Sequence, residues 1–152
     1  MLKIWGRPTS ACTQKALWGI EEIGLDYKFT LASGTMGPNG HVSKGGEAFG
    51  VVDTPEYRAM NPMGLVPTII DDGFVMWESN AITRYLSEKY GQGVLYPDDA
   101  QGRATADTWM DWQLTTVAKF MFPVFWGLVR TKPADRNMDQ INAAIQEGVK
   151  FW

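Results

Sequence analysis

Ser10 and Cys12, close to the N-terminus, are two side chains that can take part in thiol chemistry. They follow a short apolar stretch and precede apolar residues at helical spacing, so both are expected at the start of a helix. A free thiol has a pKa of about 8.5 and is mostly protonated at neutral pH. A helix N-terminus and a hydroxyl donor both stabilise the thiolate. The alternative for Cys12 is a small, partly buried side chain.

Glu78 and Ser79 form a second polar pair, again just before a segment with helical spacing. An acidic side chain beside a hydroxyl and the free N–H groups of a helix start suits a ligand that carries both an ammonium and a carboxylate. Taken from the local sequence alone, the pair is better explained by a Ser N-cap that follows an exposed Glu.

Several other functions are disfavoured by composition. One His and one Cys cannot build a zinc site, so no metal is expected. Gly45-Gly46 follows no strand directly and matches no phosphate loop. The formal charge of −3 and the pI of about 5.1, without a basic run, argue against nucleic acid as a partner.

The expected location is cytoplasmic. The first apolar stretch is too short for a signal peptide, and no apolar run approaches the ~20 residues of a membrane span, so no membrane partner is expected. A single cysteine cannot form an intrachain disulfide, which agrees with a reducing compartment.

The elements that must position these pairs alternate between strands and helices. The order predicted is βαβαββα, which favours a mixed four-stranded sheet covered by helices. The expected strands cover residues 2–5, 25–31, 66–70 and 74–77, and the expected helices begin near residues 10–13, 54 and 79.

After this region the pattern becomes all-helical. Residues 91–99 contain Gly and Pro and are interpreted as a linker between a domain at 1–90 and a second region at 100–152. Helices are expected from residue 100 to about 130, divided or kinked at Pro123, and from 138 to 152.

Two linked motifs carry a family resemblance. Residues 61–68 (Asn-Pro-Met-Gly-Leu-Val-Pro-Thr), followed by residues 77–82 (Trp-Glu-Ser-Asn-Ala-Ile), resemble the glutathione-site core of glutathione transferases. Tyr96-Pro97 and residues 109–112 are similar to the bacterial, serine-type (theta/zeta-like) members. The resemblance implies a thioredoxin-like N-terminal domain followed by an all-α C-terminal domain, here incomplete.

The resemblance also implies how glutathione is held. In the family the peptide bond before the motif proline is cis, which here is Val66–Pro67. Val66 then offers its N–H and C=O to the cysteinyl part of glutathione, as an added strand would; otherwise Val-Pro only starts an edge strand. Glu78 and Ser79 resemble the pair that binds the γ-glutamyl end.

Two residues compete for the chemical role. In serine-type members the catalytic hydroxyl lies five residues before a basic residue, and Ser10 and Lys15 have this spacing. Cys12 stands where another bacterial class carries a cysteine that forms mixed disulfides with glutathione. Thr9, Thr13 or the backbone are further candidates.

The chain departs from the family at two positions of the site. Some relatives carry Lys or His in place of Gly64 and Arg in place of Asn80, and both help to hold the carboxylates of glutathione. Here the glycine carboxylate needs another cation or N–H groups. Lys44 and His41 are the candidates.

The last departure is the length, because family members continue for several more helices. The aromatic residues of the helical region would pack against those helices or line the electrophile pocket, and exposed together they would form a large apolar patch. They are Trp109, Trp112, Phe120, Phe122, Phe125 and Trp126.

The function expected is a transferase that conjugates the glutathione thiolate to small, mostly apolar electrophiles, with glutathione as co-substrate. Two alternatives stay open: a glutathione-dependent thiol–disulfide reductase that uses Cys12, and a noncatalytic domain that binds protein partners. The resemblance implies a homodimer.

Overall fold

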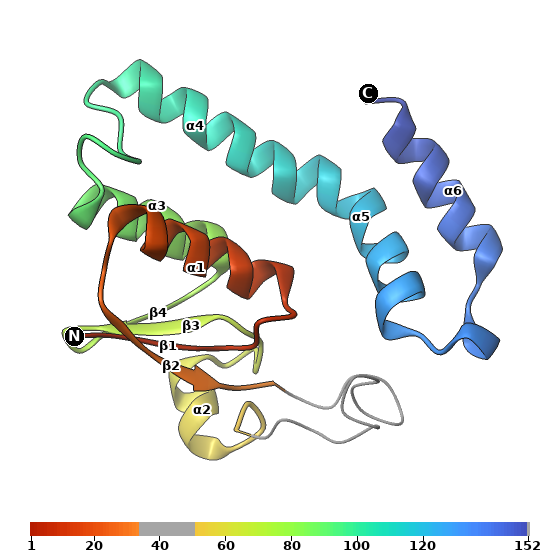
Figure 1. Ribbon diagram of the computed structural model, residues 1–152, viewed down its shortest axis with the longest axis horizontal. Helices are drawn as coiled ribbons and strands as arrows, with labels where there is room; N and C mark the ends of the chain where they lie inside the picture. The colour runs from red at the N-terminus through yellow and green to blue at the C-terminus, as the bar shows by residue number, and fades with distance from the viewer. Residues whose placement is uncertain (34–50, 152) are drawn as a thin grey trace. The chain divides into compact units, whose positions relative to one another are not determined.

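The computed structural model describes residues 1–33 and 51–151. Residues 1–33 and 51–100 belong to one compact unit, and residues 101–151 belong to a second (Figure 1). The predicted division into a domain at 1–90, a linker at 91–99 and a domain at 100–152 stays a prediction.

The first unit contains the predicted mixed four-stranded sheet. The strand order is β2-β1-β3-β4, with β1 parallel to β2 and antiparallel to β3, and with β3 antiparallel to β4. The elements are β1 (Leu2–Gly6), α1 (Ala11–Ile23), β2 (Tyr27–Leu31), α2 (Pro55–Met60), β3 (Thr68–Asp71), β4 (Phe74–Trp77) and α3 (Ser79–Tyr90). The thioredoxin-like fold predicted from the sequence is confirmed.

Helices cover both faces of this sheet. Figure 1 shows α1 and α3 on one face and α2 on the other. The main core lies between the sheet and the α1–α3 pair; its buried members are Leu2, Ile4, Ala16, Ile20, Ile69, Ile82 and Leu86. A smaller core lies beneath α2; its buried members are Ala32, Val52 and Tyr57.

The helix ends follow the predicted local chemistry. Ser10 is the N-cap of α1 and its side chain accepts a hydrogen bond from the N–H of Thr13. Gly24 ends the helix in the left-handed conformation, with φ of 76°. Thr54 caps α2 in the same way, with Pro55 at the first helical position.

The start of β3 differs from the prediction. The strand begins at Thr68 rather than Val66, because the carbonyl of Leu65 is held by the Tyr57 hydroxyl (2.7 Å) and the Asn61 amide (2.9 Å) instead of a neighbouring strand. Pro67 also has no N–H to donate to a sheet.

The turn between β3 and β4 is shorter than expected. Asp71 belongs to β3, and Asp72-Gly73 alone make the turn, with φ values of 48° and 90°. Two positive φ values are those of the tight hairpin turn that Asp-Gly favours.

The second unit is a set of helical segments. They are α4 (Ala100–Trp112, whose first residue still belongs to the first unit), η2 (Gln113–Val117), α5 (Ala118–Phe125), η3 (Trp126–Arg130), η4 (Pro133–Asp135) and α6 (Met138–Val149). Pro123 was predicted to kink or divide the helix; it lies inside α5, so it does not divide the helix, and the kink stays a prediction. The helix instead changes to π geometry before and after α5, in η2 and η3. Inside α-helices, π geometry usually occurs as single turns, and such turns are one known cause of a kink.

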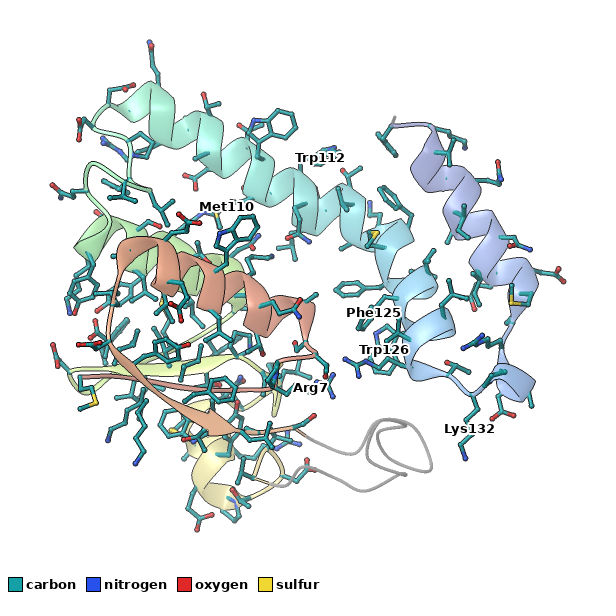
Figure 2. The ribbon with its side chains drawn as sticks, in the orientation of Figure 1. Arg7, Met110, Trp112, Phe125, Trp126 and Lys132 are labelled. Atoms are coloured by element: carbon teal, nitrogen blue, oxygen red, sulfur yellow. The ribbon has the colours of Figure 1, made fainter. Side chains whose placement is uncertain are left out.

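The second unit packs mainly through α5 and α6. Gly127 of η3 and Gly148 of α6 allow close packing at these contacts. A Cβ on Gly127 would meet Ile141, and a Cβ on Gly148 would meet Phe120. Phe120 is buried, and its ring stacks on that of Phe151 with 5.6 Å between the centroids. It is therefore not part of an exposed aromatic patch. Figure 2 shows Phe125 and Trp126 projecting from the junction of α5 and η3. In the described part of the chain, no helix combines the length and the apolar character that a membrane span requires.

Candidate functional site

Five of the predicted site residues line one pocket of the first unit. Cys12 comes from the first turn of α1, Val66 and Pro67 from the segment before β3, and Glu78 and Ser79 from the junction of β4 and α3. The cavity has a volume of about 80 Å³. It is therefore suited to part of an extended peptide ligand rather than to a whole one.

The motif segment is held in place by one buried amide. Asn61 is 2 % exposed, and its Nδ2 donates to the Leu65 carbonyl (2.9 Å) and to the Thr68 hydroxyl (3.1 Å). Its Oδ1 accepts from the Met63 N–H at 3.1 Å. These bonds fix the segment that carries Val66, whose peptide bond to Pro67 is cis, as the resemblance implies. The sequence interpretation counted Asn61 only as the first residue of the motif and assigned it no role of its own.

Glu78 stands in a constrained backbone conformation at the pocket. Its φ is 73°, a region that costs a non-glycine residue about 1–3 kcal/mol. The Glu78 carbonyl accepts from the Ile82 N–H at 2.8 Å, which closes the first turn of α3. The side chain is exposed, lines the pocket and caps no helix N–H. The carboxylate is thus available to a ligand.

Ser79 occupies the first helical position of α3, so the prediction that it caps this helix was wrong by one residue: Glu78 is the N-cap. Ser79 is 7 % exposed and lines the pocket. The first turn of a helix leaves N–H groups without intrahelical partners. Ser79 therefore places a hydroxyl and the positive end of a helix at the same point as the Glu78 carboxylate.

Ser10 lies beside the pocket and is absent from its lining. It is 8 % exposed, and its Oγ accepts from the Thr13 N–H at 3.3 Å. This bond uses an acceptor position of the hydroxyl and leaves its proton for another partner. The loop that carries Ser10 is set by a close approach, because a Cβ on Gly6 would stand 2.7 Å from Thr13 Oγ1.

Lys15 connects α1 with the start of α3. Its Nζ donates to Asn80 Oδ1 at 2.5 Å. Burial lowers the pKa of Lys15, an effect that the charges of Cys12 and Glu78 oppose and that of Arg84 reinforces. A basic side chain five residues after Ser10 was noted in the sequence, but its partner across the helix pair was not predicted.

Two of the residues predicted to bind glutathione are not in the described part of the chain. Lys44 and His41 lie outside the described residues. A larger cavity of about 340 Å³ lies in the second unit; its lining includes Phe122 and Trp126, two of the aromatic residues expected at the electrophile pocket, and none of the residues predicted to bind glutathione. Within residues 1–33 and 51–151, no group of three or more His, Cys, Asp or Glu side chains could hold a metal ion.

Comparison with known protein families gives a match over the segments that build the pocket. The sequence profile described as "Glutathione S-transferase, N-terminal domain" matches residues 9–89, more than half of the chain. The chain belongs to the glutathione S-transferase family. Its match includes every segment that lines the pocket of the first unit.

Individual glutathione S-transferases are similar to this chain over nearly its whole length. The glutathione S-transferase GstB of Escherichia coli (strain K12) is 39% identical over 149 residues, which are 97% of this chain and 65% of GstB. A theta class glutathione S-transferase from Xanthomonas axonopodis pv. citri, solved with glutathione bound, is 44% identical. It has a TM-score of 0.85 and matches 98% of this chain and 66% of its own.

A plant relative shares the fold at lower identity. Glutathione transferase F2 from Populus trichocarpa is 21% identical with a TM-score of 0.81, and the match covers 99% of this chain and 66% of the plant protein. The chain spans about two thirds of the length of these relatives.

Proposed function

We propose that this glutathione S-transferase family member binds glutathione in the pocket of the first unit and conjugates its thiol to small, mostly apolar electrophiles. One observation carries the proposal: side chains from three separate segments, predicted to serve one ligand, line one pocket. The relative from Xanthomonas, solved with glutathione bound, supports the choice of ligand.

The γ-glutamyl end of glutathione is placed at the head of α3. The ammonium of this end pairs with the Glu78 carboxylate, and its carboxylate accepts hydrogen bonds from Ser79 and from the first-turn N–H groups of the helix. The unusual backbone conformation of Glu78 favours this role, because constrained residues concentrate at binding sites.

The cysteinyl part of glutathione is placed beside Val66 and Pro67. Main-chain hydrogen bonds to Val66 would align the ligand as an added strand. Thr68 pairs with Trp77 in the hairpin, and Val66 and Ser79, which lie two residues beyond this pair, both line the pocket. One extended ligand can therefore reach both residues.

The protein's chemical contribution is to stabilise the thiolate. The glutathione thiol releases its proton to solvent, and the Ser10 hydroxyl, polarised by the hydrogen bond that it accepts from the Thr13 N–H, donates a hydrogen bond to the resulting thiolate sulfur. The N-terminus of α1 adds a favourable dipole. The thiolate then attacks an electrophilic carbon, a bond forms between sulfur and carbon, and the leaving group departs with its electron pair. Catalysis is by positioning and charge stabilisation.

Cys12 is the competing residue for this step because it lines the pocket and Ser10 does not. The relatives are named glutathione S-transferases, which favours conjugation over a Cys12-dependent reductase and over a noncatalytic interaction domain. The proposal also includes a cytoplasmic location and a homodimer. Lys44 is proposed as the cation that pairs with the glycine carboxylate of glutathione.

Isothermal titration of the full chain with glutathione tests the proposal. We expect saturable binding that weakens about tenfold or more in Glu78→Ala. Glu88→Ala is the matched control, since it removes the same charge from the exposed far end of α3. Equal affinities for the two variants, or no binding by the unsubstituted chain, would contradict the assignment.

A further inference from the structure

The cavity of the second unit has the size and the mixed lining of a small-molecule site. Its volume of about 340 Å³ falls within the range of about 300–1,000 Å³ that ligand sites usually have. Its apolar lining comes from α5, η3 and the buried core of α6, and consists of Phe122, Pro123, Trp126 and Ile141. Its polar lining comes from the segment between η3 and α6 and from the start of α6, and consists of Thr131, Asp135, Asn137 and Gln140.

The segment that carries the polar lining is fixed by hydrogen bonds inside the second unit. Arg136 Nε donates to the Thr131 carbonyl at 3.3 Å, and its Nη2 donates to the Leu128 carbonyl at 2.8 Å. Asn137 caps α6, because its Oδ1 accepts from the Gln140 N–H at 3.0 Å. The polar side chains of the cavity are therefore presented from a backbone that its own contacts hold in place.

The lining carries a negative charge that is open to a ligand. Among the lining residues that the structure describes, Asp135 is the charged one, and neither its carboxylate nor the side-chain amide of Gln140 makes a hydrogen bond or ion pair with the protein. The adjacent cation, Arg136, is held by two backbone carbonyls instead. A carboxylate and an amide oxygen beside an apolar surface suit a ligand with both a ring and a positively charged donor.

We propose that this cavity binds a small aromatic molecule that carries a protonated amine. The ring packs against Phe122 and its apolar neighbours, and the ammonium donates to the Asp135 carboxylate and to the Gln140 amide oxygen. An anionic aromatic molecule would place its charge against the same carboxylate. The site is separate from the glutathione pocket, since all residues that line it belong to the second unit.

Isothermal titration of the full chain with three indoles tests the preference for a cation. Tryptamine, tryptophol and indole-3-acetate share a ring system and carry an ammonium, a hydroxyl and a carboxylate, respectively. We expect tryptamine to bind about three- to tenfold more tightly than tryptophol, and indole-3-acetate to bind more weakly than either. Asp135→Asn should abolish the preference for tryptamine and leave the affinity for tryptophol unchanged.

Two further variants locate the site. Asp139→Asn is the matched control, because it removes an exposed carboxylate from the first turn of α6 that does not line the cavity. It should keep the preference for tryptamine. Phe122→Ala removes part of the apolar lining and should weaken the binding of tryptamine and tryptophol alike.

Several results would overturn the inference. They are equal binding of the three indoles, no saturable binding of tryptamine, an equal loss of preference in Asp135→Asn and Asp139→Asn, and displacement of tryptamine by glutathione, which would place the amine in the first unit. The ranking of the three indoles on the unsubstituted chain needs no variant, and circular dichroism confirms folding of each variant used. A chain that binds tryptamine as expected but not glutathione would contradict the proposed function and leave this inference standing.

Discussion

The two units bury their apolar side chains to very different degrees. In the first unit, Ile4, Ile20, Ile69 and Ile82 are fully buried between the sheet and two helices. In the second, α4 has no buried residue. The large apolar side chains exposed there include Trp109, Leu114, Met121, Phe122, Trp126, Leu128 and Val129.

The unit that positions the site is therefore the one whose apolar side chains are better buried. The pocket is built on elements whose cores are complete, as a preorganised site requires. The second unit has a small core between α5 and α6, and most of its other large apolar side chains are exposed. Every residue that lines the described pocket belongs to the first unit.

The largest expected effect comes from a core residue of the first unit. Ile20→Ala should lower the free energy of unfolding by about 3 kcal/mol, because it leaves a cavity beneath α1. Val129→Ala is the control in the second unit, where the side chain is 51 % exposed. It should cost well under 1 kcal/mol. Urea unfolding followed by circular dichroism measures the free energy of unfolding of both variants. Equal losses would contradict the difference in burial between the two units.

A second effect, about 1–3 kcal/mol, is expected at the loop that carries Ser10. Gly6→Ala introduces a Cβ that collides with Thr13, a fully buried residue. Thermal unfolding should show the loss, and the double variant Gly6→Ala with Thr13→Ala should recover part of it. Additive losses in the double variant would show that the close approach is not the cause.

A third, smaller effect is a pH dependence at the far end of α3. Burial would raise the pKa of Asp71, but hydrogen bonds from Lys89, Tyr85 and Tyr90 outweigh burial and hold it below its ordinary value. A lowered pKa means that the stabilisation is present above the unfolded pKa of about 3.9. It is lost as the pH falls through the lower folded value.

The test is urea unfolding of the unsubstituted chain and Asp71→Asn between about pH 6 and about pH 2. At neutral pH the variant should be less stable by about 1–2 kcal/mol, through loss of charge-assisted hydrogen bonds to the buried carboxylate. The difference should shrink as the pH falls below 4. A difference that stays constant with pH would exclude the carboxylate as its source.

Local chemistry made the first unit predictable. Ser10, Gly24 and Thr54 define helix ends through their own backbone preferences and lie where the sequence indicates, and the Asp72-Gly73 turn differs from the prediction only by the loss of Asp71 to β3. The start of β3 was misplaced because it depends on hydrogen bonds from Tyr57 and Asn61, which periodicity does not contain.

The site was predicted only in part for a similar reason. The motifs place Val66, Pro67, Glu78 and Ser79 near one another, and the structure groups them with Cys12. The Lys15–Asn80 contact joins residues 65 positions apart, and no local pattern indicates it. Pro123 was expected to kink or divide a helix, yet it lies inside α5, and the π segments on either side of α5 were not predicted.

Steady-state conjugation of glutathione with chlorodinitrobenzene tests the central claim most directly. The claim is that a hydroxyl beside the pocket stabilises the thiolate of bound glutathione. The account predicts glutathione-dependent turnover by the full chain, a loss of about 100-fold in kcat for Ser10→Ala and a much smaller loss for Cys12→Ser. Full turnover by Ser10→Ala together with an inactive Cys12→Ser would contradict it.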